Sequence, residues 1–156
     1  MPTEFPPVEV PAAWLEVLAA LQRHGVQFVV AGSAADAIVE GDPESAAALI
    51  VAPAPFRRNF ERLAAALGEF PVRIRVGSEE SGETQPLAVT EIVNHPAVRW
   101  RLRVAGTEVD VIGSAVGDGE FSIRLWRTKA IELTGDGPSV TAEVELANAY
   151  TTAATS

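Results

Sequence analysis

The sequence contains no cysteine, and this absence removes several kinds of chemistry. Without a thiol there is no thiolate nucleophile, no disulfide framework and no zinc site built on Cys ligands. Histidine is scarce too: His24 and His95 are the two in the chain, far apart in sequence. A metal site made by two histidines one helical turn apart is therefore not expected.

Positive charge is in short supply. The chain has 12 Lys and Arg residues against 21 Asp and Glu residues, which gives a net charge of -9. A nucleic-acid backbone is repelled by such a chain unless its cations gather on one face, so nucleic acid is not an expected partner. No apolar run approaches the roughly 20 residues that cross a bilayer, and no export leader is evident. We expect a cytoplasmic chain without a membrane partner.

The sequence is rich in helix and strand patterns. Its 156 residues can bury one core, and we divide them into an extended N-terminal arm (1–10), a single domain (11–150) and a polar tail (151–156). Helices are expected over Pro11–Gly25, Ala34–Val39 with Ser33 as its cap, Phe56–Gly68 with Phe56 on its buried face, and about Thr141–Tyr150. Strands are expected over Val26–Ala31, Ala46–Ala52, Val72–Val76, Val98–Val104, Glu108–Ile112 and Ala130–Leu133, with a loop over Gly77–Gln85. This order predicts an α/β (α+β) fold, with a small mixed β-sheet flanked by helices.

Two stretches of this pattern carry a family resemblance. Gly25–Val30 leads into Gly32–Ser33, and the following short helix ends at Gly41. Further along, the strand pattern Gly106–Ile112 contains Asp110. The order resembles the minimal nucleotidyltransferases of the DNA polymerase β-like superfamily, especially small bacterial members related to toxin–antitoxin systems. The resemblance implies a nucleotidyltransferase-like fold from about Trp14 to Leu146.

The resemblance also implies where catalytic groups would stand. In that family a Gly-Gly or Gly-Ser turn holds the phosphates, a following strand carries D-h-D, and a later strand supplies a third acidic residue. Counted from Gly32, the paired aspartates would stand at positions 47 and 49, where this chain has Ala47 and Leu49, and the family's Arg falls on Glu44. Neither Ala nor Leu can coordinate Mg²⁺, so Asp110 remains as a residual acidic position. We therefore expect a degenerate nucleotidyltransferase-like protein without metal-dependent transfer.

Each candidate site residue has two interpretations. Gly32 and Ser33 either hold a phosphate or form a plain strand-to-helix turn, and Asp110 is either a residual ligand or a solvent-facing strand residue. An arginine stripe either grips an anion or a partner, or is a solvated face that protects a sheet edge. The stripe consists of Arg73, Arg75, Arg99, Arg101 and Arg103.

The expected function is a binding or regulatory domain that retains weak nucleotide binding, with no resident cofactor. One alternative is an active enzyme that holds Mg²⁺ through Asp110 and a replacement carboxylate from Asp36, Asp42 or Glu44. The other is a pure protein-interaction domain that binds a second protein or forms a homodimer. His24 is assigned a structural role at the end of the first helix.

Overall fold

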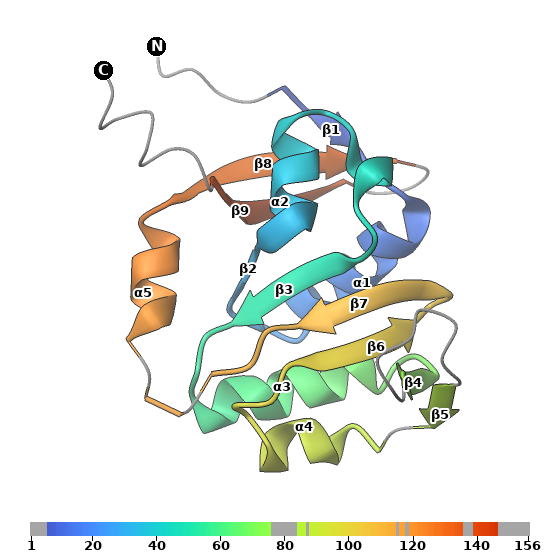
Figure 1. The fold of residues 1–156 in the computed structure, drawn as a ribbon, viewed down its shortest axis with the longest axis vertical. Helices are drawn as coiled ribbons and strands as arrows, with labels where there is room; N and C mark the ends of the chain where they lie inside the picture. The colour runs from blue at the N-terminus through green and yellow to red at the C-terminus, as the bar shows by residue number, and fades with distance from the viewer. Residues whose placement is uncertain are drawn as a thin grey trace.

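The computed structural model describes residues 6–75, 84–86, 88–114, 116–117, 119–135 and 139–146. Within these residues the chain forms one mixed β-sheet with helices on both faces, which confirms the expected α/β (α+β) class (Figure 1). The strands follow the order β1-β8-β9-β2-β3-β7-β6-β4-β5 across the sheet. No helix of the described part is long and apolar enough to cross a membrane.

The elements have the following bounds. The helices are α1 (Ala12–Arg23), α2 (Gly32–Val39), a 3₁₀ turn η1 (Pro43–Ser45), α3 (Arg57–Leu67), α4 (Thr90–Asn94) and α5 (Glu120–Leu125). The strands are β1 (Val8–Glu9), β2 (Phe28–Val30), β3 (Leu49–Pro53), β4 (Val72–Arg75), β5 (Thr84–Pro86), β6 (Trp100–Val104), β7 (Thr107–Val111), β8 (Thr128–Thr134) and β9 (Val140–Glu145).

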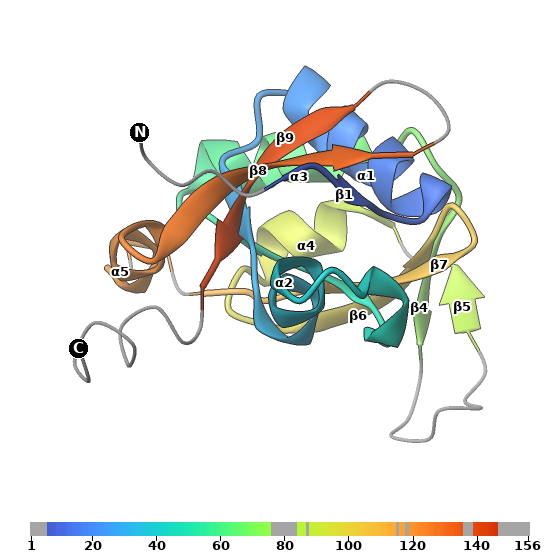
Figure 2. The ribbon, with the colours of Figure 1, turned by 90° about the horizontal axis from the view of Figure 1, so that it is seen from above.

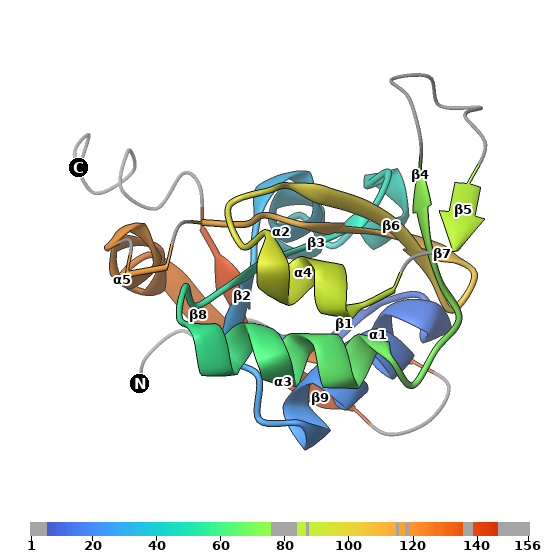
Figure 3. The same ribbon diagram turned by 90° about the horizontal axis from the view of Figure 1, so that it is seen from below.

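The two faces of the sheet are covered unequally. Helices α1, α3 and α4 lie on one face, where α1 packs against α3 and α3 against α4 (Figures 2 and 3). Helix α2 lies on the other face, against β3 and β9. Buried side chains such as Leu18, Phe60 and Leu102 form the core under α1, α3 and α4. Among the residues that the structure describes, no helix covers the second face of the part of the sheet made by β7, β6 and β4.

The central elements agree with the sequence patterns. In α1 the expected buried residues Trp14, Val17, Leu18 and Leu21 are all buried. The hairpin of β6 and β7 forms as predicted, and its turn residues Ala105 and Gly106 have positive φ, as a two-residue hairpin turn requires. In β6, Trp100, Leu102 and Val104 are buried while Arg101 and Arg103 are exposed.

The predicted helix over Thr141–Tyr150 is wrong in its described part. Val140–Glu145 forms strand β9, which pairs antiparallel with β8 and parallel with β2. Its buried residues Val140, Ala142 and Val144 alternate with exposed Thr141 and Glu143, which is the two-residue period of a strand. Residues 147–150 lie outside the described part.

Other boundaries also differ from the predictions. Phe56 precedes α3 as its N-cap and is 38% exposed, so it does not belong to the buried face of that helix. Strand β5 takes up the end of the expected loop Gly77–Gln85, of which residues 77–83 lie outside the described part. The end of the expected arm joins the sheet as β1, and helices α4 and α5 had not been predicted. Strands β1 and β5 and helices α4 and α5 are short elements, whose patterns are weak in sequence.

Both histidines contact a glutamate side chain. His24, just after α1, contacts Glu69, and Arg23 reaches the same carboxylate at 2.6 Å. The hydrogen bond from His24, then that from Arg23, holds the pKa of Glu69 below its ordinary value. His95 lies 3.4 Å from Glu91 on α4. These contacts are consistent with the structural role assigned to His24.

Candidate functional site

The candidate site lies where α2 begins and the uncovered part of the sheet starts. Helix α2 begins at Gly32, directly after β2, and the N–H of Ala31 donates a hydrogen bond to the carbonyl of Ile50 in β3 at 3.0 Å. Gly32 has a φ of +62°, and a Cβ on it would lie 3.0 Å from Cδ1 of Ile50. Position 32 therefore favours glycine for its backbone conformation and for the close approach of Ile50.

The pairing of the strands places one residue of β7 and one of β6 in a row with Ile50. Ile50 pairs with Asp110 in the parallel neighbour β7, and Asp110 pairs with Arg101 in the antiparallel neighbour β6. Residues directly opposite each other point to the same side of a sheet. Ile50, Asp110 and Arg101 therefore lie in one row on the face of the sheet that carries α2.

More charged residues share this side. Glu108 and Arg103 pair across β7 and β6, and Arg103 pairs with Arg73 across β6 and β4. We call this surface the open face and define it by Ile50, Arg73, Arg99, Arg101, Arg103, Glu108 and Asp110; it looks toward the viewer in Figure 1. Among the described residues of this face, four guanidinium groups accompany two carboxylates, an excess of two positive charges in a chain of net charge -9. The structure thus gathers most of the predicted arginine stripe.

The register of β3 and β7 shows which residue of β3 lies beside Asp110. Leu49 is fully buried and pairs with Val109, whose side chain is also fully buried, so position 49 faces the core. Ile50, one residue later, is the side chain of β3 opposite Asp110 and beside Gly32. Position 49, where the resemblance would place an aspartate, therefore faces the core, and the residue beside Asp110 is the apolar Ile50.

Asp110 is held by an arginine. Its carboxylate is 13% exposed, and its Oδ2 accepts a hydrogen bond from Nη2 of Arg99 at 2.9 Å. Arg103 lies 3.2 Å from Glu108 and also donates to the carbonyl of Gly106. Arg101 is exposed, and among the residues that the structure describes its side chain has neither an ion-pair partner nor a hydrogen-bond partner. Arg101 is therefore free to bind an external anion.

The residues present do not fit Mg²⁺. Mg²⁺ is a hard cation that takes oxygen ligands, and a protein site for it needs converging carboxylates. Here one neighbour of Asp110 is the alkyl side chain of Ile50 and another is the cation Arg99. Within the described ranges no three His, Asp or Glu side chains form a group suited to a metal, so Asp36, Asp42, Glu44 and Asp110 do not assemble a replacement set.

The other predicted site residues, Gly32, Ser33 and Arg75, lie at the start of α2 and at the end of β4. Gly32 and Ser33 are both exposed in the first turn of α2, so their backbone N–H groups face outward from the helix start. Ser33 lies inside the helix, and the N-cap is Ala31, so the prediction that Ser33 caps the helix is wrong. Arg75 ends β4, and its side chain is not among those described.

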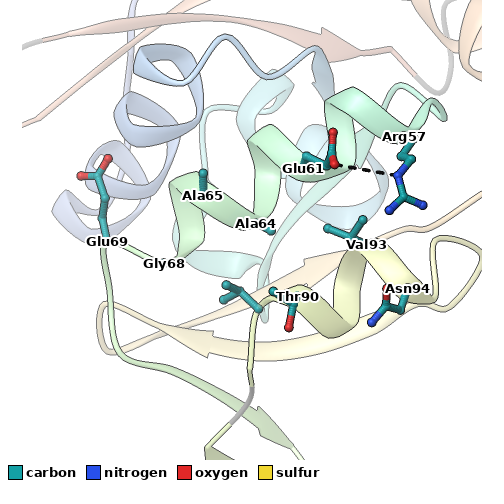
Figure 4. A pocket seen from close by; sticks show the side chains of 10 residues that line it. Arg57, Glu61, Ala64, Ala65, Gly68, Glu69, Thr90, Val93 and Asn94 are labelled. Atoms are coloured by element: carbon teal, nitrogen blue, oxygen red, sulfur yellow. Dashed lines mark ion pairs between the residues drawn. The ribbon is translucent and has the colours of Figure 1, made fainter.

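A separate pocket lies on the opposite face of the sheet. It has a volume of about 530 Å³ and lies between α3 and α4, with Ala64, Ala65 and Val93 among its lining residues (Figure 4). Arg57 and Glu61 form an ion pair at one end of it, at 3.8 Å. Its lining includes none of the residues of the open face, so it is a different surface.

No protein-family model, no curated protein and no solved structure matches the chain. What the open face binds must therefore be inferred from its own residues.

Proposed function

We propose that this chain is a nucleotidyltransferase-like protein without transfer activity, which binds the phosphate groups of a nucleotide on its open face. The carrying observation is the neighbourhood of Asp110: its carboxylate is paired with Arg99 at 2.9 Å and lies opposite Ile50. A cation of the protein thus occupies the position next to the carboxylate where the resemblance would place a metal ion.

Phosphate binding follows from the unpaired cation beside this centre. Arginine donates hydrogen bonds in a planar fork that matches the oxygens of a phosphate group. Arg101 is the residue of β6 directly opposite Asp110 of β7. Its side chain has no protein partner in the described part of the chain. The exposed first turn of α2 at Gly32 and Ser33 adds backbone N–H groups on the same side of the sheet. A nucleotide held in this way needs no metal.

Loss of transfer can be tested directly. The purified chain is incubated with labelled nucleoside triphosphates and Mg²⁺, alone and with RNA or protein acceptors. We expect no incorporation, because the side chains beside Asp110 are the alkyl group of Ile50 and the cation of Arg99, and neither can bind the metal.

Mg²⁺-dependent incorporation that disappears in Asp110→Ala and persists in Glu16→Ala would contradict the proposal. Glu16 is the control because it is an exposed carboxylate on α1, on the opposite face of the sheet from Asp110, and is not one of the candidate metal ligands. Circular dichroism of both variants checks that the substitutions leave the fold intact.

A further inference from the structure

Within the described part of the chain, one edge of strand β8 is only partly paired. Along one side, residues Thr128–Leu133 pair with β9. Along the other side, β1 pairs with Leu133 and Thr134 only, and within the described residues Thr128–Glu132 have no strand partner there. Figure 1 shows β1 beside one end of β8 while α5 leads into the other end.

Two prolines precede β1 at this edge. β1 runs parallel to β8 with Val8 opposite Leu133, so the residues that would continue the pairing toward Glu132 are those before Val8. The first two of them, Pro7 and Pro6, would lie opposite Glu132 and Ile131, and a proline has no N–H to donate to a neighbouring strand. Within the described part of the chain, the backbone groups of Thr128–Glu132 on this side have no strand partner and are available to another strand.

An exposed apolar cluster adjoins the free edge. Ile123 and Leu125 of α5 are 55% and 42% exposed, and Trp126, two residues before β8, is 92% exposed. The other two tryptophans, Trp14 and Trp100, are buried at 3% and 8% exposure. Buried tryptophans are among the strongest anchors of protein interfaces, and leaving one in water forgoes that stabilisation.

Charge indicates what the occupant carries. Lys129, the single lysine of the sequence, and Arg127 are exposed beside the free edge, and in the described part of the chain neither has an ion-pair partner. A carboxylate on an added strand would pair with them, and an apolar side chain at its end would cover Trp126.

A second copy of this chain fits the edge less well. Two β8 strands related by a two-fold axis at Ala130 would bring both Lys129 side chains onto one face as diagonal neighbours, about 7–8 Å apart, where like charges repel. Each copy also carries a net charge of -9. A lysine on an edge strand is a common device against pairing between identical chains.

We infer that the free edge of β8 binds an extended segment of another protein, which pairs with Thr128–Glu132, places a carboxylate beside Lys129 and covers Trp126 with an apolar side chain. Such strand addition obtains affinity from main-chain hydrogen bonds and specificity from alternate side chains. This surface is distinct from the open face and does not depend on nucleotide binding.

The test selects ligands from a phage library of linear peptides on the full chain and titrates synthetic copies of the selected peptides. We expect acidic, alternately apolar peptides that shift tryptophan fluorescence to the blue and slow amide hydrogen exchange at Thr128–Glu132. Lys129→Glu and Trp126→Ala should each weaken binding by about tenfold or more, as loss of an interface anchor does. Arg58→Glu, which makes the same charge change on exposed α3, should leave binding unchanged.

Three results would overturn the inference. One is the absence of any saturable peptide ligand, and another is binding that survives both Lys129→Glu and Trp126→Ala. The third is a concentration-dependent dimer that Trp126→Ala abolishes, which would assign the edge to a second copy. Both substituted side chains are exposed, so the variants are expected to fold.

Discussion

Replacement of Asn59 by alanine is expected to lower the free energy of unfolding by about 3 kcal/mol. Asn59 is a fully buried polar residue in the first turn of α3. Its Oδ1 accepts a hydrogen bond from the N–H of Gln27 at 2.8 Å, and its Nδ2 donates to the carbonyls of Gln27 and Ala54 at 2.8 and 3.0 Å. Alanine would remove all three bonds and leave the N–H of Gln27 without this partner, while the two carbonyls keep the hydrogen bonds from the main-chain N–H groups of Ala54 and Phe56.

The measurement is urea unfolding of the variant and of the parent protein, followed by circular dichroism. In a chain of this size a loss of 3 kcal/mol corresponds to a fall in Tm of roughly 10 °C. Asn94→Ala is the matched control, because Asn94 is exposed at the end of α4 and its loss should change stability by less than about 0.5 kcal/mol.

A second variant separates hydrogen bonding from packing. Asn59→Asp keeps the shape of the side chain but places a carboxylate oxygen against the carbonyls of Gln27 and Ala54. It should destabilise the chain at neutral pH at least as much as alanine does. Parent-like stability of Asn59→Asp would show that the three hydrogen bonds do not tie α3 to the sheet.

Replacement of Arg101 by glutamate is expected to weaken nucleotide binding by at least about tenfold, since one charge-assisted hydrogen bond contributes about 1.5–3 kcal/mol. Arg101 is the open-face cation with no partner in the described residues, and Arg99 and Arg103 are engaged by Asp110 and Glu108. Glutamate at this position would add repulsion of the phosphates to the loss of the guanidinium group.

Calorimetry of nucleoside triphosphate binding to the parent and variant proteins measures this effect. Arg101→Lys keeps the charge without the planar fork and should give an intermediate affinity. Arg58→Glu carries the same charge change on the far side of the sheet, on α3, and should bind as the parent protein does. Equal affinity of Arg101→Glu and Arg58→Glu would show that the phosphates are bound elsewhere.

Long amphipathic elements could be predicted from the sequence because their periods are unambiguous. The buried residues of α1 repeat at helical spacing, and the alternation of Trp100, Leu102 and Val104 with arginines specified β6 and its exposed face. The arginine stripe could be placed on one face for the same reason. Strand β9 was missed because its alternation is short and uses alanine and threonine, which also suit a helix.

The sequence alone could not show which residue of β3 lies beside Asp110. The run Ala46–Ala47–Ala48 before β3 has no alternation, so nothing in the sequence decides which neighbour faces Asp110. Pairing with β7 decides it, by placing Leu49 opposite Val109 and Ile50 opposite Asp110. The ion pair of Arg99 with Asp110 and the three bonds of Asn59 likewise depend on contacts between distant residues.

Calorimetric titration of the full chain with a panel of nucleoside triphosphates, each with and without Mg²⁺, tests most directly whether the open face binds phosphate without a metal. The row of Ile50, Asp110 and Arg101 predicts saturable binding of equal stoichiometry in both conditions. Binding that requires Mg²⁺ would contradict the account, because it would demand a metal centre that the described carboxylates do not assemble. Absence of binding to every nucleotide would contradict it as well.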